Sequence, residues 1–151
     1  IYEGTNEIQA IDLLVRKGVP DGGARLTTLF DWMQERLPEP DASPRVPAAR
    51  LALDRLRETT TRLLSRIAGR PSVAHEVADA YLHLVAFALL SLAWARMDAA
   101  AALAIAEGRG EPFHDRKRVL AAHYEQHVAL EAGLHAARVE AVGSPLASLE
   151  A

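Results

Sequence analysis

The stretch VPAARLALDRLRETTTRLLSRI, residues 46–67, decides the fold of this 151-residue chain. Seven of its positions recur at alternating steps of three and four residues: Val46, Ala49, Leu53, Leu56, Thr60, Leu63 and Ile67. This spacing puts the seven side chains on one seam of an α-helix and leaves the arginines on its other faces. We therefore expect a long helix that packs along a single stripe.

Two further long helices are predicted after this one. Gly69 and Pro71 interrupt the pattern, and Ser72 is then expected to cap a helix over residues 72–107. Its apolar residues cover a broad face, so we expect it to be the central helix: Val77, Tyr81, Leu84, Phe87, Leu90 and Trp94. A last long helix is predicted over residues 112–142, where five residues recur at a spacing of seven: Phe113, Leu120, His127, Leu134 and Ala141.

Two shorter helices are predicted before the first long one. They run from Asn6, as the cap, to the residue before Gly18 and from Ala24 to Leu37, and the segment PEPDASP, residues 38–44, follows as a linker. Short loops between the three long helices make them antiparallel neighbours. We therefore predict an all-α fold, an up-down helical bundle of three long antiparallel helices plus two shorter N-terminal helices.

Composition and charge argue against several classes of function. Half of the residues are apolar, and 151 residues suit one domain with a sizeable core. The 17 basic and 20 acidic residues give a net charge of -3, which provides no overall attraction for nucleic acid or an anionic membrane. The longest nearly apolar run, Leu84 to Ala95, is shorter than the roughly 20 residues of a membrane span. The chain has no cysteine, which suits a reducing compartment, and we expect a cytoplasmic protein.

The histidines raise the hypothesis of a metal site. Four residues in the last predicted helix follow one another at steps of four and share a face: His123, His127, Glu131 and His135. A di-iron bundle needs Glu-x-x-His pairs from two helices, and the pair of Glu111 and His114 straddles Pro112 at a helix start. Semi-buried packing or an interface explains the histidines better, and we predict no metal site.

The N-terminal stretch IYEGTNEIQ, residues 1–9, carries chemistry that packing does not require. Glu3 is expected in a loop, where its apolar neighbours would make the carboxylate a stronger base. Gly4 would let a ligand approach the backbone, and the helix start that follows offers free N–H groups. An ordinary capped helix start is the other interpretation, and the residues by themselves leave both open.

Residues 2–9, YEGTNEIQ, resemble the Y-E-G-T-x-x-I-Q signature near the C-terminus of acyl-CoA dehydrogenases. The resemblance implies that Glu3 is the base that removes the α-proton of an acyl-CoA thioester while the hydride goes to flavin. It implies that Gly4 contacts the substrate. It further implies that the cofactor FAD is contacted by Thr5, Asn6 and Glu7.

The resemblance also implies a division of the chain. Residues 1–17 would end the catalytic domain, residues 18–45 would be a short helix and linker, and residues 46–151 would be an added C-terminal helical domain. Dehydrogenases with such an added domain include the 3-methylmercaptopropionyl-CoA dehydrogenases. Since the sequence starts without methionine, we expect it to be part of a longer chain. By itself it is expected to be inactive and to bind no FAD.

The same resemblance implies an acyl-CoA substrate, an electron-transferring flavoprotein as the electron acceptor, and a homo-oligomer. A non-catalytic helical interaction or oligomerisation module is the alternative function. The regular seam of residues 46–67 and the apolar character of the following helix favour that alternative.

The three long helices are expected to form the stable core. Truncating Leu56 or Leu90 to alanine should then cost about 2 to 5 kcal/mol. The tail GSPLASLEA, residues 143–151, is expected to fray, so Leu146 should contribute little. Residues 1–17 are expected to pack least firmly, because their partners in a longer chain would be missing.

Overall fold

The computed structural model describes residues 3–142 and, of Glu3, the backbone only. Every regular element in this range is helical: α1 (Glu3–Ile11), the π-helical η1 (Asp12–Gly18), α2 (Ala24–Glu35), α3 (Val46–Gly69), α4 (Val73–Ala106), α5 (Pro112–His123), the π-helical η2 (Tyr124–Val128) and α6 (Glu131–Glu140). The predicted all-α bundle is confirmed. The predicted tail, with Leu146, lies outside the described residues.

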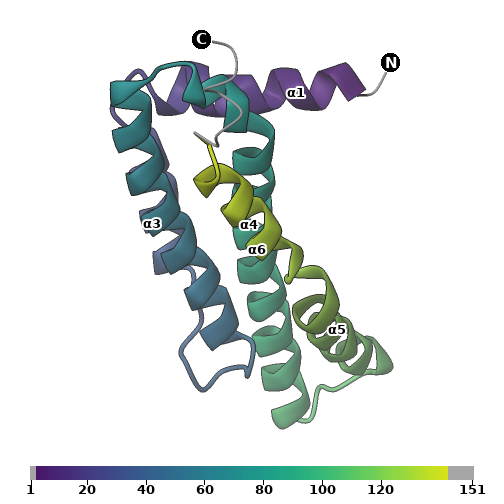
Figure 1. Cartoon of the computed structure of the whole chain (residues 1–151). Coiled ribbons are helices and arrows are strands. Elements are labelled where there is room, and N and C mark those ends of the chain that lie inside the picture. Colours follow the sequence, from purple (N-terminus) through teal and green to yellow (C-terminus); the bar gives the residue numbers. More distant parts are fainter. Residues whose placement is uncertain (1–2, 143–151) are drawn as a thin grey trace.

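The helices run up and down beside one another. Figure 1 shows α3, α4 and the arm formed by α5 and α6 side by side, with α1 lying across one end of them. α4 contacts α1, α3, α5 and α6, so it is the central helix, as predicted. α2 packs against α3 and η1.

The seam of α3 is confirmed in full. All seven of its predicted positions are buried: Val46, Ala49, Leu53, Leu56, Thr60, Leu63 and Ile67. The hydroxyl of Thr60 donates to the carbonyl oxygen of Leu56 at 2.7 Å and lies 2.8 Å from the hydroxyl of Tyr81 on α4. Burial raises the pKa of Tyr81 to about 12, so its hydroxyl stays neutral and joins the two central helices.

α4 is apolar on nearly every face. By length and composition it could cross a membrane, with a mean hydropathy of 1.6 in an 18-residue window, but half of that window is buried inside the bundle. The predicted apolar run was shorter than this window. Because almost all faces are apolar, the spacing does not identify the buried one, and the prediction for Leu90 is wrong: its side chain is 46% exposed.

The last predicted helix is interrupted. η2 and a turn at Ala129 and Leu130 divide it into α5 and α6. The residues spaced by seven face solvent, with Phe113, Leu120 and Leu134 each about half exposed. The buried face is formed instead by mostly smaller residues: Ala121, Tyr124, His135, Ala136 and Val139. Alanines pack closely against α4, so large apolar side chains do not mark the core face here.

The N-terminal helix begins at Glu3, three residues before the predicted cap Asn6, which lies inside α1. Its second half packs firmly, because Ala10 and Leu14 are almost completely buried in the same core as Leu56. The expectation that all of residues 1–17 pack loosely is therefore wrong from Ala10 onward.

Candidate functional site

The predicted catalytic and binding residues lie in the first two turns of α1. The structure places the backbone of Glu3 at the first helical position, so the predicted loop is wrong. Gly4, Thr5, Asn6 and Glu7 follow, and all four are exposed. Figure 1 shows this end of α1 projecting beyond the bundle.

The surface of these turns is open. A Cβ added at Gly4 would meet no atom within 4 Å, and Ile8, one turn further on, is 63% exposed. The first N–H groups of a helix have no partner inside it, so this end also offers hydrogen-bond donors. The chain thus supplies one side of a site and leaves the other side to a ligand or to another polypeptide segment.

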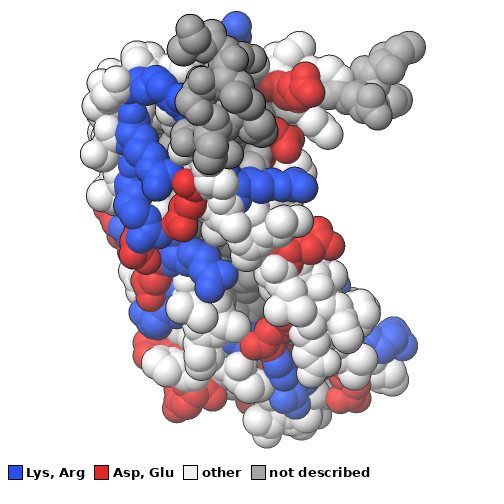
Figure 2. All heavy atoms as spheres, in the orientation of Figure 1, with Lys and Arg blue, Asp and Glu red and all other residues white. Residues whose placement is uncertain are grey.

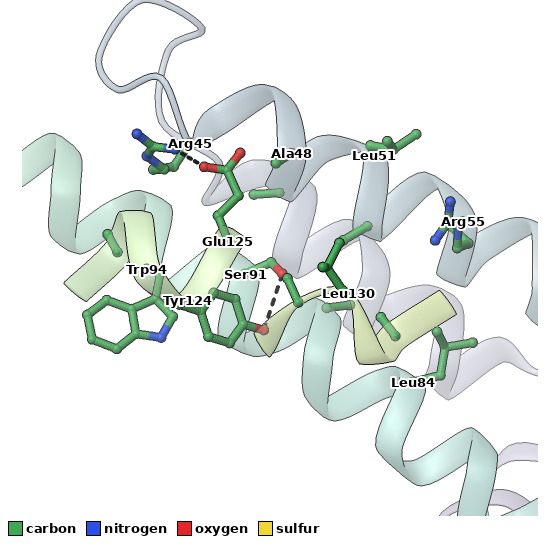
Figure 3. Close-up of a pocket in the computed structure, with 16 residues that line it drawn as sticks. Arg45, Ala48, Leu51, Arg55, Leu84, Ser91, Trp94, Tyr124, Glu125 and Leu130 are labelled. Carbon is green, nitrogen blue, oxygen red and sulfur yellow. Dashed lines mark hydrogen bonds and ion pairs between the residues drawn. The ribbon is translucent and has the colours of Figure 1, made fainter. Parts of the chain in front are cut away.

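A groove that the sequence did not predict lies between α3, α4 and the α5–α6 arm (Figure 3). It is a cavity of about 280 Å³. α3 and α4 contribute Arg45, Ala48, Ala49, Leu51, Ala52, Arg55, Leu84, Ala88, Ser91 and Trp94, and the arm contributes Ala121, Tyr124, Glu125, Ala129, Leu130 and Ala132.

Two local features create this groove. Seven of its 16 lining residues are alanines, whose methyl groups leave space between the helices. The wall on the arm passes through η2, where the N–H of Ala129 donates to the carbonyl oxygen of Tyr124 at 2.9 Å, five residues back. Such π-helical turns are frequent at functional sites, and this one places Tyr124 and Glu125 on the groove.

Polar groups lie at both ends of the groove. Glu125 forms an ion pair with Arg45 at one end (Figure 3), and the Nε of Arg45 is buried without a hydrogen-bond partner among the described residues. Arg55 lies at the other end, with no carboxylate of the described residues at ion-pair distance. The hydroxyl of Tyr124 donates to the carbonyl oxygen of Phe87 at 3.0 Å, and burial raises the pKa of Tyr124.

A buried carboxylate lies elsewhere on α4. Asp98 is 2% exposed and accepts hydrogen bonds from the hydroxyl of Ser43 and from Nε of Arg118, the latter at 3.3 Å. Its two oxygens are therefore satisfied by the segment before α3 and by α5. This cluster holds three parts of the bundle together and leaves no free group for catalysis.

The histidines do not gather into a metal site in residues 3–142. His123 and His127 are exposed, with ring centroids 4.7 Å apart, so they are not semi-buried within the described chain, and the interface alternative stays a prediction. Nδ1 of His114 accepts the backbone N–H of Glu111 at 3.0 Å in a capping box at the start of α5. Within the described range, no group of three or more His, Asp and Glu side chains could hold a metal ion.

His135 of α6 packs against α4. Its ring stacks on His83, with centroids 4.6 Å apart and planes within 6° of parallel, and its Nδ1 is buried without a described partner. Burial, with the nearby His83 and Arg138, lowers the pKa of His135, while Asp79 and Glu131 act in the opposite direction. The folded protein therefore disfavours protonation at this position.

The free energy of unfolding should consequently depend on pH through His135. The pKa of His135 is lower in the folded protein than in the unfolded chain, where it is about 6.5. The contribution of His135 to the free energy of unfolding is therefore fully present above about pH 6.5 and is lost as the pH falls below that value. We expect His135→Phe, which keeps a ring at this position, to lose less stability than the parent between pH 7.5 and pH 5.5 in urea titrations. Equal pH dependence of the free energy of unfolding in the parent and in His135→Phe would contradict the assignment.

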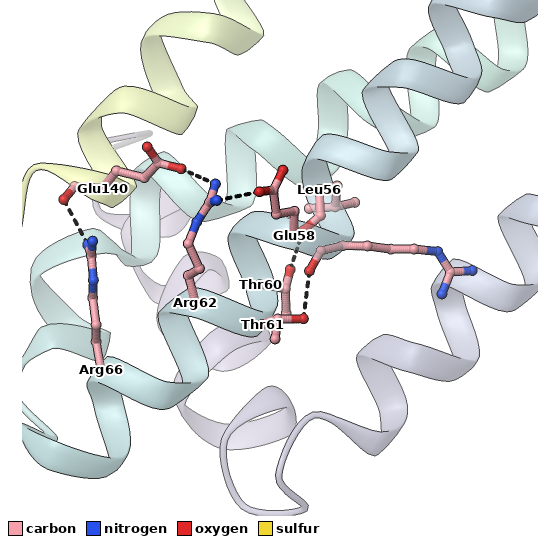
Figure 4. Close-up of polar contacts among 8 residues, drawn as sticks. Leu56, Glu58, Thr60, Thr61, Arg62, Arg66 and Glu140 are labelled. Carbon is pink, nitrogen blue, oxygen red and sulfur yellow. Dashed lines mark hydrogen bonds and ion pairs between the residues drawn. The ribbon is translucent and has the colours of Figure 1, made fainter.

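Basic side chains gather along α3 beside acidic ones (Figure 2). Figure 4 shows Arg62 between Glu58 and Glu140, and Arg66 donating to the backbone carbonyl oxygen of Glu140 at 2.7 Å. Three of the interactions in this region therefore tie α3 to itself or to α6. Arg62 and Glu58 form an i,i+4 ion pair, so the arginines of α3 do not form a bare basic stripe.

Comparison with known families gives one match. A family model described as "Acetyl-CoA dehydrogenase C-terminal like" matches residues 27–150. No curated protein matches the chain significantly. The matched range begins inside α2 and continues through α6, so it excludes α1, which carries most of the YEGTNEIQ stretch.

Proposed function

The chain belongs to the acetyl-CoA dehydrogenase C-terminal like family, and from this premise we propose that it is the C-terminal part of an FAD-dependent acyl-CoA dehydrogenase. The observation that carries the proposal is the combination of this family match with the signature stretch directly before it. Two independent parts of the chain, residues 2–9 and residues 27–150, thus point to the same class of enzyme.

The proposed reaction is the α,β-dehydrogenation of an acyl-CoA thioester. Glu3 is the base that takes the α-proton, and Gly4 contacts the substrate. The open surface around Gly4 supports this assignment, because a thioester could approach the backbone there without displacing any described side chain.

FAD is the cofactor that this function requires, and the first turns of α1 fit one side of its site. Thr5, Asn6 and Glu7 are exposed and carry hydroxyl, amide and carboxylate groups that can contact a flavin. When bound, FAD supplies the acceptor for the substrate's β-hydride. Five residues cannot enclose a flavin, so the remaining contacts belong to other domains or to another subunit.

The finer assignments extend this proposal. The 3-methylmercaptopropionyl-CoA dehydrogenase-like subgroup, electron transfer to an electron-transferring flavoprotein and a cytoplasmic location remain predictions. So do the domain limits at residues 17 and 45. The core supports continuity across both limits, because Leu14 and Leu26 are buried in one cluster with Leu56.

The experiment that tests the proposed function uses the complete polypeptide encoded around this sequence. Mixed anaerobically with a panel of acyl-CoA thioesters that includes 3-methylmercaptopropionyl-CoA, its flavin should bleach with at least one of them. Crotonyl-CoA, which is already unsaturated at the α,β position, is the matched control and should cause no bleaching. A complete polypeptide that purifies without flavin, or that no thioester of the panel reduces, would contradict the proposal.

A non-catalytic oligomerisation module is the second candidate function. It is favoured by the large apolar side chains of Phe113, Leu120 and Leu134 on the α5–α6 arm, each of which is about half exposed. On this alternative, the complete polypeptide would associate with a second copy but carry no reducible flavin. The thioester experiment therefore separates the two functions.

A further inference from the structure

The groove between α3, α4 and η2 has the construction of a small-molecule site. Its volume of about 280 Å³ lies just below the roughly 300–1,000 Å³ of known ligand pockets. Its floor is apolar and rigid, because Leu84 and Ala88 of α4 are buried in the core. Such a volume accommodates a compact ligand better than a partner helix.

Two leucines at the rim of the groove have exposed apolar side chains. Leu51 on α3 and Leu130 on the arm both line the groove (Figure 3), and they are 61% and 70% exposed. A ligand with an apolar body would cover both leucines. This burial is the part of binding that the hydrophobic effect favours.

The charged residues of the groove favour a negatively charged ligand. The groove is lined by two arginines, Arg45 and Arg55, and by one glutamate, Glu125. Glu125 forms an ion pair with Arg45. This leaves Arg55 as the cation without a carboxylate partner among the described residues, and its Nη1 lies beside Gly133, where an added Cβ would meet it at 3.9 Å. A guanidinium group matches the planar geometry of a carboxylate.

We propose that this groove binds a small monocarboxylate, with its apolar body between Leu51 and Leu130 and its carboxylate on Arg55. The site contains none of residues 3–9 and needs no flavin, so it is independent of the proposed catalytic role of α1. The orphaned Nε of Arg45 at the opposite end offers a further donor to a ligand that reaches it.

Trp94 provides the signal for a binding test. The chain has two tryptophans, Trp94 in the groove and Trp32 on α2 outside it, so Trp32→Phe leaves a single reporter at the site. Octanoate, titrated below its micellar range, should change the Trp94 emission saturably. Octanol and octylammonium, which have the same apolar body without the negative charge, should bind more weakly.

Two matched variants locate the carboxylate. In the Trp32→Phe background, Arg55→Gln should weaken octanoate binding about tenfold or more and leave octanol binding unchanged, because a charge-assisted hydrogen bond is lost. Arg50→Gln makes the same change on α3 outside the groove and should leave both ligands unaffected. Ala52→Leu should reduce the binding of both, since it fills the groove wall, and circular dichroism should verify that each variant remains helical.

Several results would overturn the proposal. One is an emission that changes only linearly with octanoate, and another is equal affinity for octanoate and octylammonium. A third is an equal loss of octanoate binding in Arg50→Gln and Arg55→Gln. None of these outcomes depends on whether the complete enzyme reduces flavin, so the two proposals fail separately.

Discussion

Glu3→Gln in the complete dehydrogenase should slow flavin reduction by an acyl-CoA substrate about a hundred- to ten-thousand-fold. Glutamine keeps the size and shape of the side chain but cannot accept the α-proton, and general base catalysis contributes about this much to a reaction rate. Flavin content and acyl-CoA binding should be retained. The measurement is anaerobic stopped-flow bleaching of the flavin with the best thioester of the panel.

Two further variants make this test specific. Glu3→Asp restores a carboxylate with a shorter reach and should recover part of the rate. Glu35→Gln removes an exposed carboxylate of α2, outside the proposed site, and should leave the rate of flavin reduction unchanged. If Glu3→Gln bleaches as fast as the parent, Glu3 is only the first residue of α1 and the base lies elsewhere.

Leu56→Ala should lower the free energy of unfolding by about 2 to 5 kcal/mol, because it removes buried methyl groups and leaves a cavity. Leu56 is 0% exposed and lies in the main core cluster with residues of α2, α4 and α6. Since the free energy of unfolding of a domain is only about 5 to 15 kcal/mol, this single change should remove a large part of it. Urea unfolding followed by circular dichroism measures it.

Leu90→Ala is the matched control on the central helix. Leu90 is 46% exposed, so the same truncation should cost clearly less than Leu56→Ala, although the sequence predicts about 2 to 5 kcal/mol for each of them. Similar losses for the two variants would mean that the exposed face of α4 is covered in solution, as the oligomerisation alternative requires.

The helices of this bundle could be predicted from sequence where one face alone is apolar. On α3 the arginines and glutamates exclude every face but one, and each of the seven seam positions is buried. α4 has apolar residues on nearly all faces. The sequence therefore predicts its length but not its buried face. On the α5–α6 arm Phe113, Leu120 and Leu134 face solvent while Ala121 and Ala136 face the core, so the residues spaced by seven do not mark the buried face.

The two candidate sites, the start of α1 and the groove, also differ in whether the sequence predicts them. The exposed start of α1 was found through a local signature, because YEGTNEIQ is contiguous in the chain. The groove is formed by residues from Arg45 to Ala132, and seven of the 16 are alanines, which carry no chemical signal in sequence. The stacking of His83 on His135 also depends on contact between helices. Such features require the three-dimensional packing.

The π-helical turn η2 holds one additional residue of chain. A π-turn contains an additional residue compared with an α-turn, and one residue of an α-helix corresponds to about 100° of rotation. Deleting a single residue within Tyr124–Val128 should therefore convert the π-turn into an α-turn and leave Ala136 and Val139 on the core face of α6. Deleting one residue inside α5 should instead turn the helix that follows by about 100°, so the bundle tolerates a loss of one residue at η2 and not in the α-helical turns before it.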